Sequence, residues 1–209
     1  MPSPFFDRHA AGLQLARALR APPHPFVLGI ARGGVVVAAA VSQALQAPLD
    51  VIVIRKVGHP LQPELAIGAV SADGESVSTQ HAIAFPQPLL QLLFAKAKRD
   101  ADALDKRLRG GAESLDLSGR AVIVVDDGIA TSATMLCALA SARRRGAAHL
   151  TCAVPVGPAD SLEHLRGHYD ELVVLIAAHE VPFAVGRYYF AFQEISDARV
   201  RDELARSRH

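Results

Sequence analysis

Two adjacent carboxylates in the middle of the chain are followed at once by a group of hydroxyls. Asp126 and Asp127 come after an apolar run at 121–125, and residues 131–134 read Thr-Ser-Ala-Thr. Hydroxyls and the free N–H groups of a helix N-terminus can hold a phosphate monoester. Because carboxylates repel a phosphate, we expect the two aspartates to lie one sugar away, on vicinal ribose hydroxyls or beside a Mg²⁺ bound to them. The segment therefore has the chemistry of a ribose 5-phosphate site.

The residues around this segment predict a turn that joins a strand to a helix. Residues 122–125 are a β-branched run typical of a buried strand, and residues 131–140 are small and suited to a helix. Ligands of open α/β sheets bind at the carboxyl ends of strands, where such a turn lies. The alternative is an ordinary turn in which Asp127 or Thr131 caps the helix, but it leaves the acidic pair and the nearby hydroxyls unexplained.

A second turn, rich in glycine, lies nearer the N-terminus. Residues 26–30 predict a strand and residues 35–45 an apolar helix, with Ala-Arg-Gly-Gly between them at 31–34. Glycine lets the backbone approach a ligand closely. Taken alone, the segment could be a simple turn with a solvated arginine, but together with the acidic pair it predicts a second part of the same site.

A third segment ends an apolar strand, predicted at 50–54, with two cations, Arg55 and Lys56. Two cations near the glycine turn suit a diphosphate group. The alternative is a solvated strand end. Two prolines follow, and for His59 and Glu64 a polar contact with a ligand and an ordinary solvent position stay equally open.

The acidic segment resembles the 5-phosphoribosyl-1-pyrophosphate (PRPP) motif of the class I phosphoribosyltransferases, in which an apolar strand, two acidic residues and three variable positions precede Thr-Gly-x-Thr/Ser. The resemblance implies that Asp126 and Asp127 bind the ribose hydroxyls and that residues 131–134 surround the 5-phosphate. Ser132 departs from the family, which usually has glycine there. A Cβ at this position costs about 1 kcal/mol if the backbone needs a positive φ, and the hydroxyl offers a compensating donor.

The other two segments resemble the same family. In its members a first loop binds pyrophosphate through backbone N–H groups and one basic residue, often across a cis non-proline bond. The resemblance gives this role to Arg32, Gly33 and Gly34, with the bond from Ala31 to Arg32 as the candidate for the cis form. Residues 55–58 look like the Arg-Lys-x-Gly sequence of adenine-type members, which leads into a mobile loop.

The resemblance implies displacement of pyrophosphate from C1 of PRPP by a nucleophile, usually a ring nitrogen, through a transition state with positive charge on the ribosyl ring. Binding would supply orientation and electrostatics, with Mg²⁺ on the departing diphosphate and the acidic pair as indirect support for the ion. The expected catalytic residues are Asp126, Asp127, Arg32 and Lys56. The expected substrate-binding residues are Arg55, Gly33, Gly34, Ala130, Thr131, Ser132, Ala133 and Thr134.

The sequence leaves the acceptor and two other functions open. Ala130 stands where 6-oxopurine enzymes of the family usually have an aspartate, whereas adenine-type and uracil-type enzymes have alanine, so adenine is a lead. A regulatory protein that senses PRPP or a nucleotide without turnover is a second candidate. Arg32 and residues 55–56 argue against it, because a 5-phosphate sensor needs no pyrophosphate loop. A hydrolase would need a water activator such as His59 or His179, and neither lies in a diagnostic motif.

Composition and patterning predict one α/β domain over residues 1–209, with a doubly wound, mostly parallel sheet flanked by helices and a small hood. The 50% hydrophobic content of 209 residues suffices for a full core. A net charge of +1 argues against bulk nucleic-acid binding. The sequence has no apolar run of ~18 residues and no signal-peptide pattern, so we expect a cytoplasmic protein without membrane contact. We also expect a homodimer, and Cys137 and Cys152 as reduced core residues.

Three parts of the chain are expected to extend a minimal domain. Residues 57–80 predict a mobile loop or hairpin with an Asp-Gly turn. Residues 87–109 predict a long inserted helix whose mixed charges indicate a solvated or dimer-facing surface. Residues 179–209 predict a C-terminal hood or tail. Its aromatic part either packs on the core or forms a base pocket from Phe183, Val185 and Tyr189.

Overall fold

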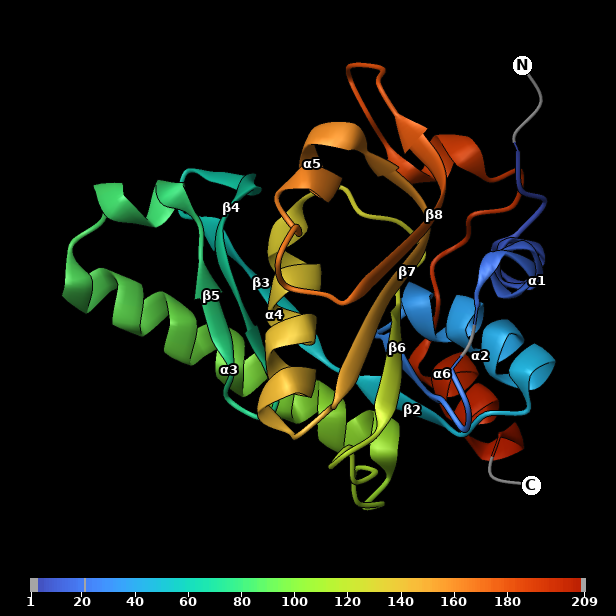
Figure 1. Cartoon of the computed structure of the whole chain (residues 1–209). Coiled ribbons are helices and arrows are strands. Elements are labelled where there is room, and N and C mark those ends of the chain that lie inside the picture. Colours follow the sequence, from blue (N-terminus) through green and yellow to red (C-terminus); the bar gives the residue numbers. More distant parts are fainter. Residues whose placement is uncertain (1–3, 21, 208–209) are drawn as a thin grey trace.

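Five parallel strands form the central sheet of the protein (Figure 1). The computed structural model describes residues 4–20 and 22–207. The side chains of Pro63 and Glu64 are also outside the described residues, and with them the polar contact expected of Glu64. The strand order is β2-β1-β6-β7-β8, which confirms the predicted α/β fold. The strands are β1 (Phe26–Ile30), β2 (Leu49–Ile52), β6 (Ala121–Val125), β7 (His149–Pro158) and β8 (Glu171–Ala178).

Helices cover both faces of this sheet. On one side lie α1 (Arg8–Ala18), α2 (Gly33–Leu45) and α6 (Asp197–Arg206), and on the other lie α4 (Ser132–Arg144) and α5 (Ala159–Glu163) (Figure 1). Alternate residues of one strand enter the two cores, since Ile123 packs with α1 and α2 whereas Val124 packs with α4. Burial of both faces explains why the strands are continuous apolar runs. Within the described residues, no helix has the length and apolar composition needed to cross a membrane.

A second, antiparallel sheet stands beside the first (Figure 1). It contains β3 (Ile54–His59), β4 (Gln62–Ser71) and β5 (Ser76–Ser78), and it leads into the 3-10 helix η1 (Gln80–Ala84) and α3 (Gln87–Arg109). The hairpin predicted within 57–80 is present, and Gly74 in its turn has a φ of +93°. The single strand predicted at 50–54 is wrong, because β2 ends in the central sheet and β3 begins in the small one.

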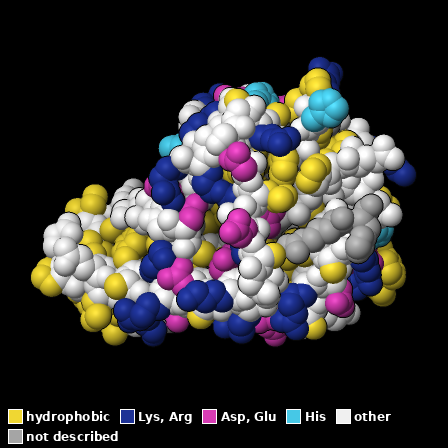
Figure 2. All heavy atoms as spheres, turned by 90° about the horizontal axis from the view of Figure 1, so that it is seen from below, with side chains coloured by type: hydrophobic (Ala, Val, Ile, Leu, Met, Phe, Trp, Pro, Cys, Tyr) yellow, Lys and Arg dark blue, Asp and Glu magenta, His cyan; other side chains and the backbone are white. Residues whose placement is uncertain are grey.

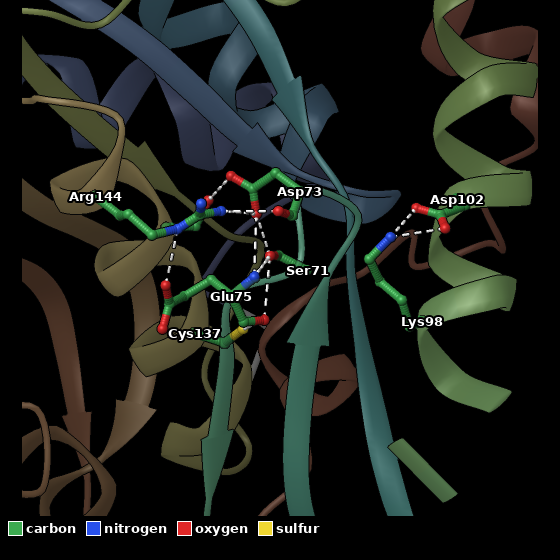
Figure 3. Close-up of polar contacts among 8 residues, drawn as sticks. Ser71, Asp73, Glu75, Lys98, Asp102, Cys137 and Arg144 are labelled. Atoms are coloured by element: carbon green, nitrogen blue, oxygen red, sulfur yellow. Dashed lines mark hydrogen bonds and ion pairs between the residues drawn. The ribbon is translucent and has the colours of Figure 1, made fainter. Parts of the chain in front are cut away.

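The turn between β4 and β5 is fastened to α4 by a polar cluster (Figure 3). Asp73 accepts hydrogen bonds from Ser71 and, at 2.6 Å, from Ser141 of α4. Arg144 donates to the backbone carbonyl of Asp73 at 2.8 Å and pairs with the Glu75 carboxylate at 2.9 Å. Burial acts to raise the pKa of Asp73, but the hydroxyls of Ser141 and Ser71 bring it below its usual value. The small sheet is thereby held against the helix that follows the acidic pair.

A buried ion pair fastens α3 to the edge strand β2. Nη1 of Arg109 lies 2.7 Å from Oδ1 of Asp50, and the two side chains are 9% and 4% exposed. Nη2 of Arg109 donates to the Val51 carbonyl at 2.6 Å, and Oδ2 of Asp50 accepts from the backbone N–H of Leu115 at 2.9 Å. Both charges are therefore hydrogen-bonded. Arg109 also pairs with Asp105 of the same helix, whose Oδ1 lies 2.9 Å from its Nε, so removal of Arg109 would leave Asp50 buried without its ion-pair partner, whereas removal of Asp50 would leave Arg109 with Asp105.

The segment before α1 lies beside the segment at 188–191, next to the sheet. The backbone N–H of Phe5 donates to the Tyr188 carbonyl at 3.0 Å, and that of Phe190 donates to the Phe5 carbonyl at 2.9 Å. Phe5, Tyr188 and Tyr189 are buried in one cluster, against which Phe183 packs. For Tyr189, packing on the core is thus the observed arrangement.

Asp50→Ala is expected to lower the free energy of unfolding by about 2 kcal/mol, because it leaves the buried Arg109 guanidinium with Asp105 as its one carboxylate partner and removes the acceptor of the Leu115 N–H. Urea unfolding followed by circular dichroism measures the change. Asp102→Ala is the matched control, since it removes the more exposed Lys98–Asp102 pair from the same helix and should cost less than about 1 kcal/mol (Figure 3). Equal losses in the two variants would contradict the role given to the buried pair.

Candidate functional site

Two loops that follow neighbouring strands form the centre of the candidate site. The glycine turn at 31–34 follows β1, the acidic pair follows β6, and these strands are paired in the sheet. A Cβ added to Gly33 would lie 2.0 Å from Oδ2 of Asp127, and one added to Gly34 would lie 2.8 Å from Oδ1 of Asp126. Glycine is therefore needed at both positions for the two loops to touch.

Asp126 and Asp127 are only partly exposed. The backbone N–H of Asp127 donates to Oδ1 of Asp126 at 2.9 Å. Burial, and then the neighbouring charge of Asp127, raises the pKa of Asp126 well above its ordinary value. Burial also raises the pKa of Asp127, although Arg8 acts in the opposite direction. The pair holds carboxyl groups where charge is disfavoured, which is typical of functional sites.

The sequence analysis missed Arg8, the first residue of α1. Its Nε lies 2.7 Å from Oδ2 of Asp127, and the two side chains are 9% and 17% exposed. Its Nη1 donates to the Gln193 carbonyl at 2.8 Å, and its guanidinium carbon lies 3.8 Å from the centre of the Phe192 ring. The Tyr189 hydroxyl donates to the backbone carbonyl of Asp127 at 2.5 Å. Arg8 and Asp127 are 119 positions apart, so no local pattern could have linked them.

The hydroxyl-rich segment begins α4. Thr131 is extended, with φ −135° and ψ 148°, and its side chain makes no capping hydrogen bond. Thr131 is exposed, Ser132 and Thr134 are partly exposed, and Ala133 is buried in the core. The side chain of Thr131 does not cap α4, so the backbone N–H groups of the first turn of the helix are available to an anion. The hydroxyls of Thr131, Ser132 and Thr134 lie at the same end of the helix.

Ser132 fits its position with an ordinary backbone conformation. It is the first residue of α4, and among the residues that the structure describes only His24 and Gln46, apart from glycines, have a positive φ. The cost considered for a Cβ at this position therefore does not arise from the backbone. Its hydroxyl is an additional donor in the first turn.

Arg32 follows a cis peptide bond with Ala31, the form that the family resemblance suggested. Its guanidinium pairs with Glu194 at 2.8 Å and with Asp197 at 3.7 Å. Asp197 also pairs with Arg107 at 3.0 Å. The C-terminal segment thus supplies carboxylates to the basic residue that we expect to bind a diphosphate.

Arg55 and Lys56 lie inside β3. The prediction that they stand at the end of a strand is therefore wrong. Arg55 is partly exposed and Lys56 is exposed. Burial, and then repulsion from Arg32, lowers the pKa of Arg55. The two arginines therefore belong to one basic region, although Arg32 follows β1 of the central sheet and Arg55 lies in β3 of the small one.

The two histidines considered as water activators have other surroundings. Nδ1 of His59 accepts from the backbone N–H of Leu61 at 3.1 Å, and its ring meets the Phe85 ring edge-on with centroids 5.0 Å apart. His179 is exposed just after β8. Neither arrangement is that of a general base oriented by an acid, which weakens the hydrolase alternative.

Two cavities in the described structure lie away from this site. Cavities of about 230 Å³ and about 1130 Å³ lie elsewhere in the described structure, the first lined by Arg109 and Arg145 among others and the second by Gln43 and Arg206 among others. Neither is lined by the glycine turn, the acidic pair or the first turn of α4. We therefore locate the site from the chemistry of its loops.

Known proteins resemble this chain in sequence and structure. Residues 19–189 match the phosphoribosyl transferase domain family. Two curated proteins of Mycobacterium tuberculosis, named "Putative phosphoribosyl transferase Rv0571c" and "Putative phosphoribosyl transferase MT0597", are each 42% identical over 201 residues, which is 94% of this chain and 45% of the relative. The crystal structure of TT1426 from Thermus thermophilus is 38% identical, with a TM-score of 0.83 over 97% of this chain and 98% of that one. The chain thus spans about half the length of the curated relatives that it matches.

Glu194→Gln is expected to tighten the binding of pyrophosphate about two- to five-fold, because the exposed carboxylate no longer competes for Arg32. Calorimetric titration with pyrophosphate and Mg²⁺ measures the affinity. Glu163→Gln, which breaks the exposed ion pair with Arg166, is the control and should leave the affinity unchanged. An affinity no tighter than that of the wild type would show that Glu194 does not compete with this ligand.

Asp126→Asn is expected to raise the free energy of unfolding above that of the wild type, by an amount that grows as the pH rises. Burial raises the pKa of Asp126, so the stability linked to this group is fully present below the unfolded value of about 4 and is lost as the pH rises through the folded value. Asparagine does not ionise and keeps an oxygen for the N–H of Asp127. Thermal unfolding at about pH 5 and about pH 8 should show a larger gain at the higher pH. A gain that does not change with pH would contradict this account.

Proposed function

We propose that this chain, which belongs to the phosphoribosyl transferase domain family, transfers the ribose 5-phosphate of PRPP to a nitrogenous acceptor and releases pyrophosphate. The observation that carries the proposal is the close approach of Gly33 to Asp127, beside a first turn of α4 that Thr131 does not cap. The glycine turn, the acidic pair and the start of α4 match the three parts of PRPP, which are its diphosphate, its ribose hydroxyls and its 5-phosphate.

In this proposal the 5-phosphate binds at the start of α4. Thr131, Ser132 and Thr134 supply hydroxyl donors, and the first turn supplies backbone N–H groups. The helix dipole adds partial positive charge at the same end. Ala133 holds the turn against the core, since its side chain is buried.

Asp126 and Asp127 accept hydrogen bonds from the ribose hydroxyls. As the acceptor nitrogen attacks C1, the bond from C1 to the diphosphate breaks and its electron pair leaves with the pyrophosphate. The two carboxylates stabilise the positive charge that develops on the ribosyl ring, and their partial burial strengthens this effect. The protein needs no covalent nucleophile, because orientation of the two reactants lowers the barrier.

Arg32, Arg55 and Lys56 bind the departing diphosphate, and the arginines can do so with two hydrogen bonds each. We expect Mg²⁺ at this end as an ion that the substrate carries, because diphosphate oxygens are ligands of the kind that Mg²⁺ prefers. When bound, the ion lowers the negative charge of the leaving diphosphate, with the acidic pair as indirect support through the ribose hydroxyls.

A nucleobase is the proposed acceptor, with adenine as the lead. Support comes from Ala130, which stands where 6-oxopurine enzymes of the family usually have an aspartate. It is exposed just before Thr131. A sensor that binds PRPP or a nucleotide without turnover is the second candidate. The pairing of Arg32 with Glu194 favours it, because that pairing lowers the positive charge available to a leaving diphosphate.

A cytoplasmic homodimer also forms part of the proposal. Hydrophobic atoms gather at the end of the molecule formed by the small sheet and α3 (Figure 2). Leu61, Ile83 and Leu92 are strongly exposed in the elements of this end, and exposed apolar side chains of this kind favour self-association. Elsewhere on the face shown in Figure 2, Lys and Arg alternate with Asp and Glu, a mixture that does not favour nucleic acid.

Purified protein is expected to bind PRPP in the presence of Mg²⁺ and to release pyrophosphate when a suitable nucleobase is added. Calorimetry measures the binding, and a coupled pyrophosphate assay measures release over a set of bases that includes adenine and uracil. Asp126→Asn should bind PRPP at least about ten-fold more weakly, because it removes a charged acceptor for the ribose hydroxyls. Binding without release would favour the sensor, and no binding would overturn the proposal.

A further inference from the structure

Arg8 is a buried cation at the start of α1. The helix itself does not explain why a cation lies there. Asp7 already caps α1 by accepting from the N–H of Ala10 at 2.7 Å. A cation in the first turn is opposed by the helix dipole, and its burial costs further free energy. The Arg8 side chain is nevertheless only 9% exposed. What Arg8 contacts must therefore account for its place.

The segment at 189–193 holds Arg8 and its partner in place. Besides the Asp127 carboxylate, the guanidinium contacts the Gln193 carbonyl and the face of Phe192. Phe192 stacks in turn on Tyr189, with ring centroids 4.9 Å apart, and Tyr189 donates to the backbone carbonyl of Asp127. The side chain and the backbone of Asp127 are thus fixed by one connected set of residues.

These contacts restrict the Asp127 carboxylate to one orientation. The torsion that turns a carboxylate about its last bond is broad when nothing holds it. Here Oδ2 is bound by Arg8 and lies so close to Gly33 that no Cβ would fit between them. The carboxyl group of Asp126 is a further hydrogen-bonding neighbour of this carboxylate, and Oδ1 is the oxygen that Arg8 does not bind.

We propose that Arg8 is a positioning residue for the ribose end of the site, which holds Asp127 so that its other oxygen accepts a ribose hydroxyl. This inference rests on the proposed function. The carboxylates that pair with Arg32, at the diphosphate end, are Glu194 and Asp197. Nε of Arg8 also lies 3.0 Å from the position of a Cβ added to Gly33, but its charged contact is with Asp127, so Arg8 should act more strongly on the binding of the sugar than on the binding of pyrophosphate.

Calorimetric titrations with ribose 5-phosphate and with pyrophosphate, each with Mg²⁺, separate the two ends of the site. Arg8→Met is expected to bind ribose 5-phosphate at least about ten-fold more weakly than the wild type, with pyrophosphate affinity within about two-fold. Arg8→Lys keeps the charge but loses the fork of donors, so an intermediate loss is expected. Arg17→Met, an exposed position of the same helix, is the control and should match the wild type.

Two results would overturn the inference. One is ribose 5-phosphate affinity equal to the wild type in the Arg8 variants, and the other is an equal loss for both ligands, which would indicate a structural role alone. If Arg8→Met does not fold, Arg8→Lys decides, since a selective loss of ribose 5-phosphate binding supports the inference and wild-type affinity overturns it. Wild-type protein that binds neither ligand would instead overturn the proposed function itself, and the role of Arg8 with it.

Discussion

The candidate site depends on contact between two loops that neighbouring parallel strands bring to one edge of the sheet. β1 and β6 are paired, so the turns that follow them start about 4.8 Å apart. Gly33 and Gly34 lack a Cβ, and this lets the carboxylates of Asp127 and Asp126 lie where side-chain atoms would otherwise be. The sheet thus sets the distance between the loops, and the glycines allow acidic groups to lie against a backbone that can bind an anion. The first turn of α4 and the basic residues are arranged around this contact.

The small sheet adds to the site because the chain changes sheets between β2 and β3. Arg55 and Lys56 lie at the start of β3, directly after this change. The other end of the small sheet is fastened to α4 through Asp73 and its partners. The first turn of the same helix follows the acidic pair. One helix therefore supports both the hydroxyl-rich turn at 131–134 and the sheet that carries Arg55 and Lys56, which fixes the spacing between them.

Local patterns in the sequence predicted the parallel sheet, the glycine turn and the hairpin, because each of these depends on residues close together in the chain. The prediction failed at 50–54, since an unbroken apolar run does not show at which residue the chain leaves one sheet for another. It also missed Arg8 and Glu194, whose ion pairs span 119 and 162 positions. Such pairs arise only when the start of α1 and the segment before α6 fold back onto the loops of the central sheet. The ligand roles given to the acidic and basic residues remain predictions.

The two ion pairs of the site differ in exposure, and this gives its two ends different properties. The side chains of Arg8 and Asp127 are 9% and 17% exposed, whereas those of Arg32 and Glu194 are 34% and 81% exposed. A buried pair cannot exchange a partner without leaving a charge uncompensated, so the acidic end is held in place before any ligand binds. An exposed pair contributes little in water and gives way to a ligand of higher charge. In the proposed reaction a diphosphate therefore replaces Glu194 on Arg32, whereas the sugar adds to Asp127 without displacing Arg8.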